Sequence, residues 1–511
     1  MQPLDPVPRP LDHLTLRGRA GDVAFVDRGG TLDYGELEDA VGRLAAALRA
    51  AGLAEGARVA SWLPKTRLTC LLPLAAARAG LVHVPINPVL RRTQAVHILE
   101  DSGAALLITN AARGASLIED GRAAPCAVID DRDAAAWLLS GYALPPSSHD
   151  PEALAALLYT SGSTGRPKGV MLSHANMWLG AISVAHYLKL TPEDRTLAVL
   201  PLAFDYGQNQ LLSAWAAGSA VVPLDYLTAR DVVNAVGRHG VTTLAGVPPL
   251  WIQITEAAWP DAARASLKRL TNSGGAMPRA LLDRLRALFP GAAVHLMYGL
   301  TEAFRSTSLD PARIDTDAHT VGTAIPFAEI MVVAPDGTIA GDGEAGELVH
   351  AGPLVAGGYW KDPARTAERF KDAPVASRYG GTAVWSGDRV RRGADGLITV
   401  LGRDGEMIKT SGNRVSPGEI EEAAMASGAV TQAAAFGVPD DRLGQAIALV
   451  ARASGRADEA EPRLRAWFLR ELPAHMQPRA IHWRESLPIS PNGKFDRAAL
   501  RVELERGELD A

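Results

Sequence analysis

Apolar residues recur at two different spacings along the first two thirds of the chain. Between Gly35 and Leu53 they lie three and four positions apart, with a glycine near the end, which is the pattern of an amphipathic helix. Short continuous apolar runs alternate with such segments and are typical of buried parallel strands. These runs occupy 58–63, 83–87, 104–109, 196–201, 220–225 and 242–247. Helices alternating with buried strands predict layered α/β subdomains.

The pattern changes twice in the remaining third. Beyond Asp310, short strands broken by Gly and Asp predict a small antiparallel, β-rich subdomain. After Leu401, about 100 residues carry their own strands and helices, including a helix expected over 462–472, which is enough for a separate small domain. We therefore expect an α/β fold with a large N-terminal body at 1–402 and a small α+β C-terminal domain at 403–511.

Composition and charge narrow the class of protein. The 511 residues are 47% hydrophobic and 21% charged with a formal net charge of −5, and the scattered Lys and Arg argue against nucleic acid as a ligand. Two cysteines are too few for a disulfide framework, and the N-terminus lacks the apolar core of a signal peptide. The charge-free segment 206–224 is interrupted by polar residues, unlike a membrane span. We expect a soluble cytoplasmic protein that binds neither nucleic acid nor membrane.

The stretch TSGSTGRPKG at 160–169 combines three glycines, four hydroxyl side chains and two cations. Such a loop offers many N–H and hydroxyl donors with little bulk, which an oligophosphate requires. Its spacing is not that of a Walker A loop, because a glycine follows the lysine. A flexible linker is the alternative, but strand-like and helix-like segments flank the loop closely. The predicted phosphate-binding residues are Thr160, Ser161, Gly162, Ser163, Thr164, Gly165 and Lys168.

Three further segments carry side chains suited to nucleotide chemistry. Glu302, in YGLTE at 298–302, suits a metal ion or a nucleotide hydroxyl, although an ordinary strand-to-loop turn has the same pattern. Asp388, in SGD, is either a ribose ligand or part of a surface turn. Lys494, in PNGKFD, follows a Pro/Asn/Gly turn near the C-terminus, where a lysine is ordinarily solvated.

Taken in order, TSGSTGRPKG, YGLTE, SGD, GRDGEMIKTSGNRVSPGEIE and PNGKFDR resemble the superfamily of AMP-forming adenylating enzymes, from about Thr31 to Leu500. This superfamily comprises acyl- and aryl-CoA synthetases, adenylation domains of nonribosomal peptide synthetases, and firefly-type luciferases. The resemblance implies that ATP and Mg²⁺ activate a carboxylic acid as an acyl adenylate, which a thiol then captures. Because Lys494, Glu302 and the glycine-rich loop are intact, a non-catalytic nucleotide-binding relative is disfavoured.

The resemblance also implies roles for individual residues. The glycine-rich loop would hold the β- and γ-phosphates of ATP, Thr301 would contact the α-phosphate, and Glu302 would help to bind Mg²⁺. Lys494 would reach between the substrate carboxylate and the α-phosphate, where two anions meet and cationic stabilisation is required. The remaining nucleotide-binding positions implied are Tyr298, Gly299, Gly274, Gly275, Ala276, Asp388 and Arg403, with Asp388 on the ribose hydroxyls.

The C-terminal domain of family members is a mobile lid that rotates between the two half-reactions about a hinge in a GRx(D/K) segment. Here Gly405 stands where Asp or Lys is usual. Glycine tolerates the large φ/ψ changes of a hinge, so rotation is still expected, without a charged side chain to favour one lid position. In the thiolation step, the segment 409–413 would lie along a pantetheine arm.

The segment FDYG at 204–207 indicates which kind of carboxylic acid is the substrate. Amino-acid adenylation domains carry FDxS, whose Asp pairs with the substrate ammonium, whereas acyl- and aryl-CoA synthetases usually carry His where this chain has Phe204. Asp205 in its apolar context therefore predicts an ammonium partner, and capping of a helix that starts near Gly207 is the alternative. We interpret the chain as a stand-alone ligase that loads an amino acid, proline first, onto a separate carrier protein. The alternative is an acyl-CoA ligase for a small or hydroxylated carboxylic acid, with CoA as acceptor.

Overall fold

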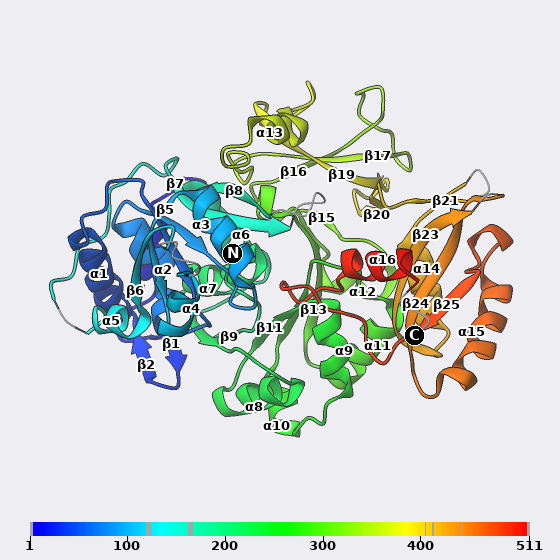
Figure 1. Cartoon of the computed structure of the whole chain (residues 1–511), viewed down its shortest axis with the longest axis horizontal. Coiled ribbons are helices and arrows are strands. Elements are labelled where there is room, and N and C mark those ends of the chain that lie inside the picture. Colours follow the sequence, from blue (N-terminus) through cyan, green and yellow to red (C-terminus); the bar gives the residue numbers. More distant parts are fainter. Residues whose placement is uncertain are drawn as a thin grey trace.

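The computed structural model describes residues 4–118, 124–139, 141–161, 167–403, 405–410, 413–440 and 442–507, apart from the side chains of Ser161 and Arg414. Within this part of the chain the strands form four sheets (Figure 1). Two of them build the N-terminal body, a third packs beside them, and the fourth belongs to the C-terminal domain.

The two sheets of the body are mostly parallel. The first has the order β15 (Thr323–Ala324), β14 (Thr307–Ser308), β13 (Ala293–Tyr298), β12 (Arg269–Asn272), β11 (Thr243–Gly246), β9 (Arg195–Ala198), β10 (Ala220–Pro223), β1 (Val23–Asp27) and β2 (Gly30–Asp33). The second has the order β6 (Ala127–Asp130), β5 (Ala104–Thr109), β3 (Arg58–Trp62), β4 (Val82–Pro85), β7 (Leu154–Ser161) and β8 (Pro167–Ser173). The predicted α/β fold is confirmed.

Helices connect these strands and cover the sheets (Figure 1). They are α1 (Tyr34–Ala50), α2 (Arg67–Arg78), α3 (Arg92–Ser102), α4 (Ala111–Ser116), α5 (Asp131–Ala136), α6 (His174–Tyr187), α7 (Asp205–Ala216), α8 (Ala229–His239), α9 (Pro248–Glu256), α10 (Asp261–Ser266), α11 (Arg279–Leu288) and α12 (Ile314–Asp317). Short 3₁₀ turns occur at η1 (Leu11–Leu16), η2 (Thr301–Ala303) and η3 (Pro311–Arg313).

Helix α7 lies in the core, and all of its residues are buried. It packs so closely on the preceding loop that a Cβ on Gly207 would lie 1.9 Å from the carbonyl oxygen of Pro201. The helix begins at Asp205, and its N-cap residue Phe204 makes no capping bond with its side chain. The alternative role of Asp205 as a helix cap is therefore wrong, because the helix starts two residues earlier than the sequence suggested.

The third sheet is antiparallel, as the Gly- and Asp-broken strands beyond Asp310 predict. Its strands are β16 (Glu329–Val333), β17 (Ala345–Ala351), β19 (Thr382–Arg392) and β18 (Phe370–Asp372), with β20 (Ile398–Arg403) paired to β19 and α13 (Pro363–Arg369) before β18. Ser386, Gly387 and Asp388 lie inside β19 and not in a surface turn.

The C-terminal domain is built on the fourth sheet, with the order β22 (Asn413–Val415), β21 (Ile408–Thr410), β24 (Gly444–Ala453) and β23 (Val430–Asp440), and β25 (Ala480–Trp483) paired to β24. Its helices are α14 (Pro417–Ala426), α15 (Ala457–Glu471) and α16 (Arg497–Glu505), with a 3₁₀ turn at η4 (Ala474–Met476). The predicted helix at 462–472 thus begins five residues earlier and carries Pro462 within it. The chain passes from the third sheet to the fourth between Arg403 and Ile408.

A loop of the C-terminal domain reaches into the body. In Figure 1 the red segment that precedes α16 runs from this domain towards β13 and α9. The side-chain amide of Asn87 donates to the carbonyl oxygen of Pro491 over 2.8 Å, and Phe495 packs against the body core around α9 and α11. The C-terminal domain is therefore closed on the body in this structure, with Lys494 between these two anchoring contacts.

Candidate active site

Lys494 lies against the start of α7. Its Nζ is 4.8 Å from the centre of the Phe204 ring. Burial lowers the pKa of Lys494, and the negative charge of Asp205 opposes this more than that of any other carboxylate. A Cβ on Gly274 would come within 2.5 Å of Lys494 Cε, so the glycine at this position makes room for the lysine stem. The structure thus brings Lys494, Asp205 and Gly274 together, although they are far apart in the sequence.

Asp205 has protein partners on more than one side. The hydroxyl of Thr301 donates to its Oδ1 over 2.9 Å, and Nη2 of Arg305 lies 3.7 Å from its Oδ2. Asp205 is 3% exposed and Arg305 2% exposed. Burial raises the pKa of Asp205, and the positive charges of Arg305 and Lys494 oppose that rise. A buried carboxylate with these partners has no need of a substrate ammonium for charge balance.

A strained turn presents Arg305 to the site. Phe304 has φ 60° and ψ −67°, and the Arg305 N–H donates to the carbonyl oxygen of Ala303 over 2.6 Å, which makes a γ-turn of the rare positive-φ kind. The Phe304 ring packs so tightly on α6 that a Cβ on Gly180 would lie 2.2 Å from it. Such strain persists only where the surroundings fix it, and it clusters at functional sites.

Glu302 sits in a small polar cluster on the other side of this turn. The Tyr359 hydroxyl donates to Glu302 Oε1 over 2.6 Å, and Lys168 Nζ lies 3.6 Å from the same oxygen. The ammonium of Lys168 also lies 3.8 Å from the centre of the Tyr359 ring. Thr160 is paired in register with Lys168 across the β7–β8 hairpin, and its buried Oγ1 has no hydrogen-bond partner among the described residues.

Asp388 is the centre of a third cluster. The Tyr298 hydroxyl donates to its Oδ2, and Nε of Arg403 donates to its Oδ1 over 2.7 Å. Burial and the adjacent negative charge of Asp388 raise the pKa of Tyr298. These three predicted residues come from β13, β19 and β20, and the structure places them side by side.

The other predicted positions are spread around these clusters. Gly299 lies where an added Cβ would be 3.0 Å from Arg305 Cα. Gly275 and Ala276 are exposed, and the Gly275 carbonyl accepts from the Asn272 side chain over 3.0 Å. An added Cβ on Gly405 would meet no atom within 4 Å. The predicted Gly162, Ser163, Thr164, Gly165 and the side chain of Ser161 lie outside the described residues.

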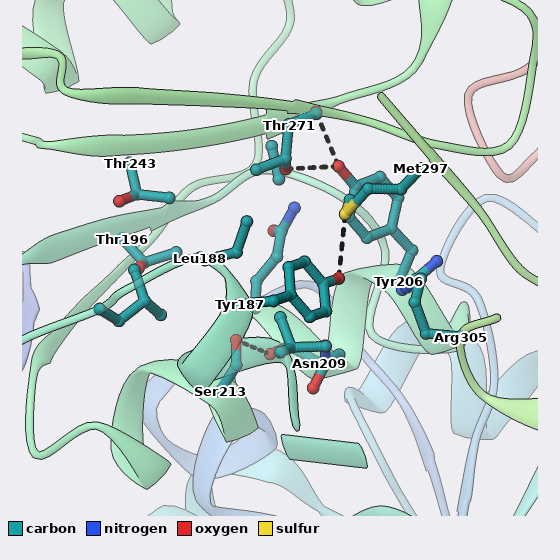
Figure 2. A pocket seen from close by; sticks show the side chains of 14 residues that line it. Tyr187, Leu188, Thr196, Tyr206, Asn209, Ser213, Thr243, Thr271, Met297 and Arg305 are labelled. Atoms are coloured by element: carbon teal, nitrogen blue, oxygen red, sulfur yellow. Dashed lines mark hydrogen bonds between the residues drawn. The ribbon is translucent and has the colours of Figure 1, made fainter. Parts of the chain in front are cut away.

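A small pocket opens beside Arg305 (Figure 2). Two aromatic walls are fixed by hydrogen bonds, since the Tyr206 hydroxyl donates to the Thr271 carbonyl oxygen over 2.7 Å and the Tyr187 hydroxyl donates to Met297 Sδ over 3.0 Å. The guanidinium of Arg305 covers the Tyr206 ring at 4.6 Å. The remaining lining residues are Val184, Leu188, Leu190, Thr196, Asn209, Gln210, Ser213, Thr243 and Ala245.

Sequence reasoning missed Arg305 and the residues that line this pocket. Arg305 follows YGLTE by three positions, between Phe304 and the run Ser306-Thr307-Ser308, and no local pattern there marks a buried charge. Helices α6 and α7, the segment after α6, and strands β9, β11, β12 and β13 supply the other lining residues, and an apolar pattern along buried elements does not reveal which face borders a cavity.

Comparison with known proteins identifies the family of this chain. The model of the AMP-binding enzyme family matches residues 14–360, and that of the AMP-binding enzyme C-terminal domain matches residues 419–494. The chain belongs to the AMP-binding enzyme family. It is accordingly an AMP-forming acid–thiol ligase, which adenylates a carboxylic acid and passes it to a CoA or carrier-protein thiol.

Several relatives of this AMP-binding enzyme match over nearly its whole length. Feruloyl-CoA synthase of Amycolatopsis sp is 32% identical over 93% of this chain and 95% of its own, and sulfoacetate–CoA ligase of Cupriavidus necator is 34% identical over 93% of both. Tyrocidine synthase 3 of Brevibacillus parabrevis is 31% identical over 92% of this chain and 7% of its own. The predicted kinship with stand-alone amino-acid ligases is therefore not specific, because CoA ligases match over the same length.

Solved structures agree with the fold. A benzoate CoA ligase from Burkholderia xenovorans LB400 is 26% identical, with a TM-score of 0.85 over 96% of this chain and 99% of its own. ATP-bound MatB from Rhodopseudomonas palustris is 24% identical, with a TM-score of 0.88 over 98% of this chain and 99% of its own.

Among the described helices, none has the length and apolar character that crossing a bilayer demands. Within the same ranges, no three His, Cys, Asp or Glu side chains gather into a ready-made metal site.

Proposed function

We propose that this AMP-binding enzyme activates a small aromatic or hydroxylated carboxylic acid with ATP and Mg²⁺ and transfers the acyl group to the thiol of coenzyme A. The observation that carries the proposal is the pairing of Asp205 with Thr301 and Arg305, beside the positive charge of Lys494. Because protein cations already balance this carboxylate, an uncharged substrate side chain suits the site better than an ammonium. The feruloyl- and benzoate-specific relatives support the same class of acid.

The clusters of the site match the needs of adenylation. Lys494 would stabilise the substrate carboxylate and the α-phosphate as they approach, with Thr301 beside it. Asp388 would bind the ribose hydroxyls next to Tyr298 and Arg403. The loop from Thr160 to Lys168 would hold the β- and γ-phosphates.

Glu302 fits a magnesium ion that arrives with the nucleotide. Mg²⁺ in nucleotide sites is commonly held by one or two carboxylates together with phosphate oxygens, so a single glutamate suffices. The Lys168 ammonium lies 3.6 Å from Glu302, and this contact supports a cation at that position. Lys168 would then be free to turn to the phosphates. When bound, the ion would supply positive charge to the leaving pyrophosphate.

The hinge assignment of Gly405 predicts a separation of the two half-reactions. Gly405→Pro should leave acid-dependent ATP–pyrophosphate exchange within about twofold of the parent, because the closed lid is already seen in this structure, and should lower thioester formation at least tenfold, since proline fixes φ. Gly405→Ala is the matched control, because its Cβ would meet no atom within 4 Å. Equal loss of both half-reactions in the proline variant would contradict the hinge role.

The charges around Lys494 predict the alkaline limit of the first half-reaction. Burial lowers the pKa of Lys494, the negative charge of Asp205 opposes this, and Arg403 and Arg305 lower the pKa further. The active form is the ammonium, so its loss with rising pH should lower the exchange rate. Asp205→Asn removes the opposing charge and should move the alkaline limb to lower pH. Asp283→Asn removes an exposed carboxylate on α11 and should leave the alkaline side of the pH profile unchanged. An unchanged profile in Asp205→Asn would contradict the coupling between the charges of Asp205 and Lys494.

The acceptor is tested with the full chain, ATP, Mg²⁺ and the acid that gives most exchange. The proposal predicts that free CoA at micromolar concentration yields the CoA thioester, separated by chromatography and identified by mass. Acyl adenylate that accumulates with CoA and is captured only by a phosphopantetheinylated carrier protein would overturn CoA as the acceptor.

A further inference from the structure

Polar atoms in the pocket beside Arg305 are buried and have no hydrogen-bond partner among the described residues. Besides Nε and Nη2 of Arg305, four atoms of this kind line the pocket: the oxygens Thr196 Oγ1, Thr243 Oγ1 and Asn209 Oδ1, and the nitrogen Gln210 Nε2. Each of these four residues is less than 5% exposed. Because a buried polar group without a partner is costly, a pocket that gathers four of them is suited to a ligand with a polar group of its own.

Two of these residues form a pair on the sheet. Thr196 on β9 and Thr243 on β11 are register partners on neighbouring parallel strands, so their side chains project from the same face. Figure 2 shows both threonines on the side of the pocket away from Arg305. Arg305 in turn contacts Asp205, the neighbour of Lys494. The threonine pair therefore marks the end of the pocket that lies farthest from the reacting carboxylate.

The chemistry of the lining favours a neutral group over a second anion. Threonine hydroxyls both donate and accept hydrogen bonds, the amide oxygen of Asn209 only accepts, and the amide nitrogen of Gln210 only donates. A hydroxyl on the ligand satisfies such a mixed set, whereas a carboxylate has no proton to give to Asn209 Oδ1. Arg305 is the charged residue among the described residues of the lining, and Asp205 already balances it at 3.7 Å.

We propose that the far end of the pocket binds a neutral hydroxyl group on the acid substrate, and that Thr196 and Thr243 determine specificity by hydrogen-bonding it. The inference rests on the proposed function and adds to it the position and kind of the second polar group. The nearby amides of Asn209 and Gln210 complete the hydrogen bonding of this hydroxyl.

The test compares matched acids that differ by one hydroxyl. ATP–pyrophosphate exchange is measured with the full chain for benzoate against 3- and 4-hydroxybenzoate, and for cinnamate against 4-hydroxycinnamate. We expect kcat/KM for the best hydroxylated acid to exceed that of its plain partner roughly 10- to 100-fold, because the plain acid leaves the threonine hydroxyls unpaired. Thr243→Val should bring this ratio close to one by lowering only the hydroxylated acid, and Thr196→Val should act in the same direction.

Thr307→Val is the matched control. Thr307 Oγ1 is also buried without a hydrogen-bond partner among the described residues, but Thr307 is not part of the pocket lining. The control should keep the parent ratio, with folding of each variant checked by circular dichroism. Two results would overturn this inference and leave the proposed function intact. One is a parent enzyme in which no hydroxylated acid has a higher kcat/KM than its plain partner. The other is an equal change of this ratio in Thr243→Val and Thr307→Val. Absence of exchange with every acid, plain or hydroxylated, would overturn the proposed function and the inference with it.

Discussion

Lys494→Ala should lower acid-dependent ATP–pyrophosphate exchange roughly 100- to 1,000-fold, the loss that commonly follows removal of one preorganised charge from a transition state. The expected loss follows from the position of Lys494. Lys494 is inserted between Phe204 and Gly274, beside Asp205, by a loop that Asn87 and Phe495 anchor to the body. It supplies positive charge where the carboxylate and the α-phosphate meet.

The measurement separates this role from a structural one. Lys371→Ala, which removes an exposed lysine on β18, should leave exchange at the parent rate. Thermal unfolding of Lys494→Ala should stay close to that of the parent, because a partly buried ammonium is lost while Arg305 remains beside Asp205. Exchange at the parent rate in Lys494→Ala would refute its assigned role.

Asp205→Ala should lower the free energy of unfolding by about 3–5 kcal/mol, since removal of one partner leaves the other charge buried and unpaired. The unpaired group is Arg305, which is 2% exposed; among the described residues, the Ser273 hydroxyl at 3.2 Å is then left as a hydrogen-bond acceptor for its side chain. Exchange should fall with plain carboxylic acids, which have no ammonium, and should stay at background with amino acids, because the damage is to the site and not to an ammonium contact. Urea unfolding measures the change in stability, and ATP–pyrophosphate exchange with amino acids and with plain carboxylic acids measures the change in activity.

A second substitution tests the pairing directly. Asp205→Ala combined with Arg305→Leu removes both charges and should recover part of the lost stability, so the two single changes should not be additive. Additive losses, or a loss selective for amino-acid substrates, would contradict the pairing and restore Asp205 as an ammonium partner.

Much of the fold could be predicted from the sequence because the body is built of buried strands. The apolar run at 104–109 coincides with β5, and the run at 243–246 within 242–247 is β11. Continuous apolar runs mark such strands even without alternation. The start of α7 was misplaced because Asp is a frequent helix cap, whereas here its side chain turns to Thr301 and Arg305.

The site was harder to predict for a physical reason. Motifs identify residues whose type suits a chemistry, such as Glu302, Asp388 and Lys494, but not the partners that tertiary packing supplies. The position of Arg305 depends on the turn at Phe304, where φ is positive. A phenylalanine in a sequence does not predict a positive φ. That single missed partner changes the interpretation of Asp205 from a ligand for an amine to one member of an internal ion pair.

The measurement to make first is ATP–pyrophosphate exchange with purified enzyme across the proteinogenic amino acids and across a parallel panel of short, aryl and hydroxy acids that lack the amine. The internal pairing of Asp205 predicts strong exchange in the second panel and background exchange in the first. Strong exchange with one amino acid, proline above all, and none with the amine-free acids would contradict the account and return the chain to the carrier-protein ligases.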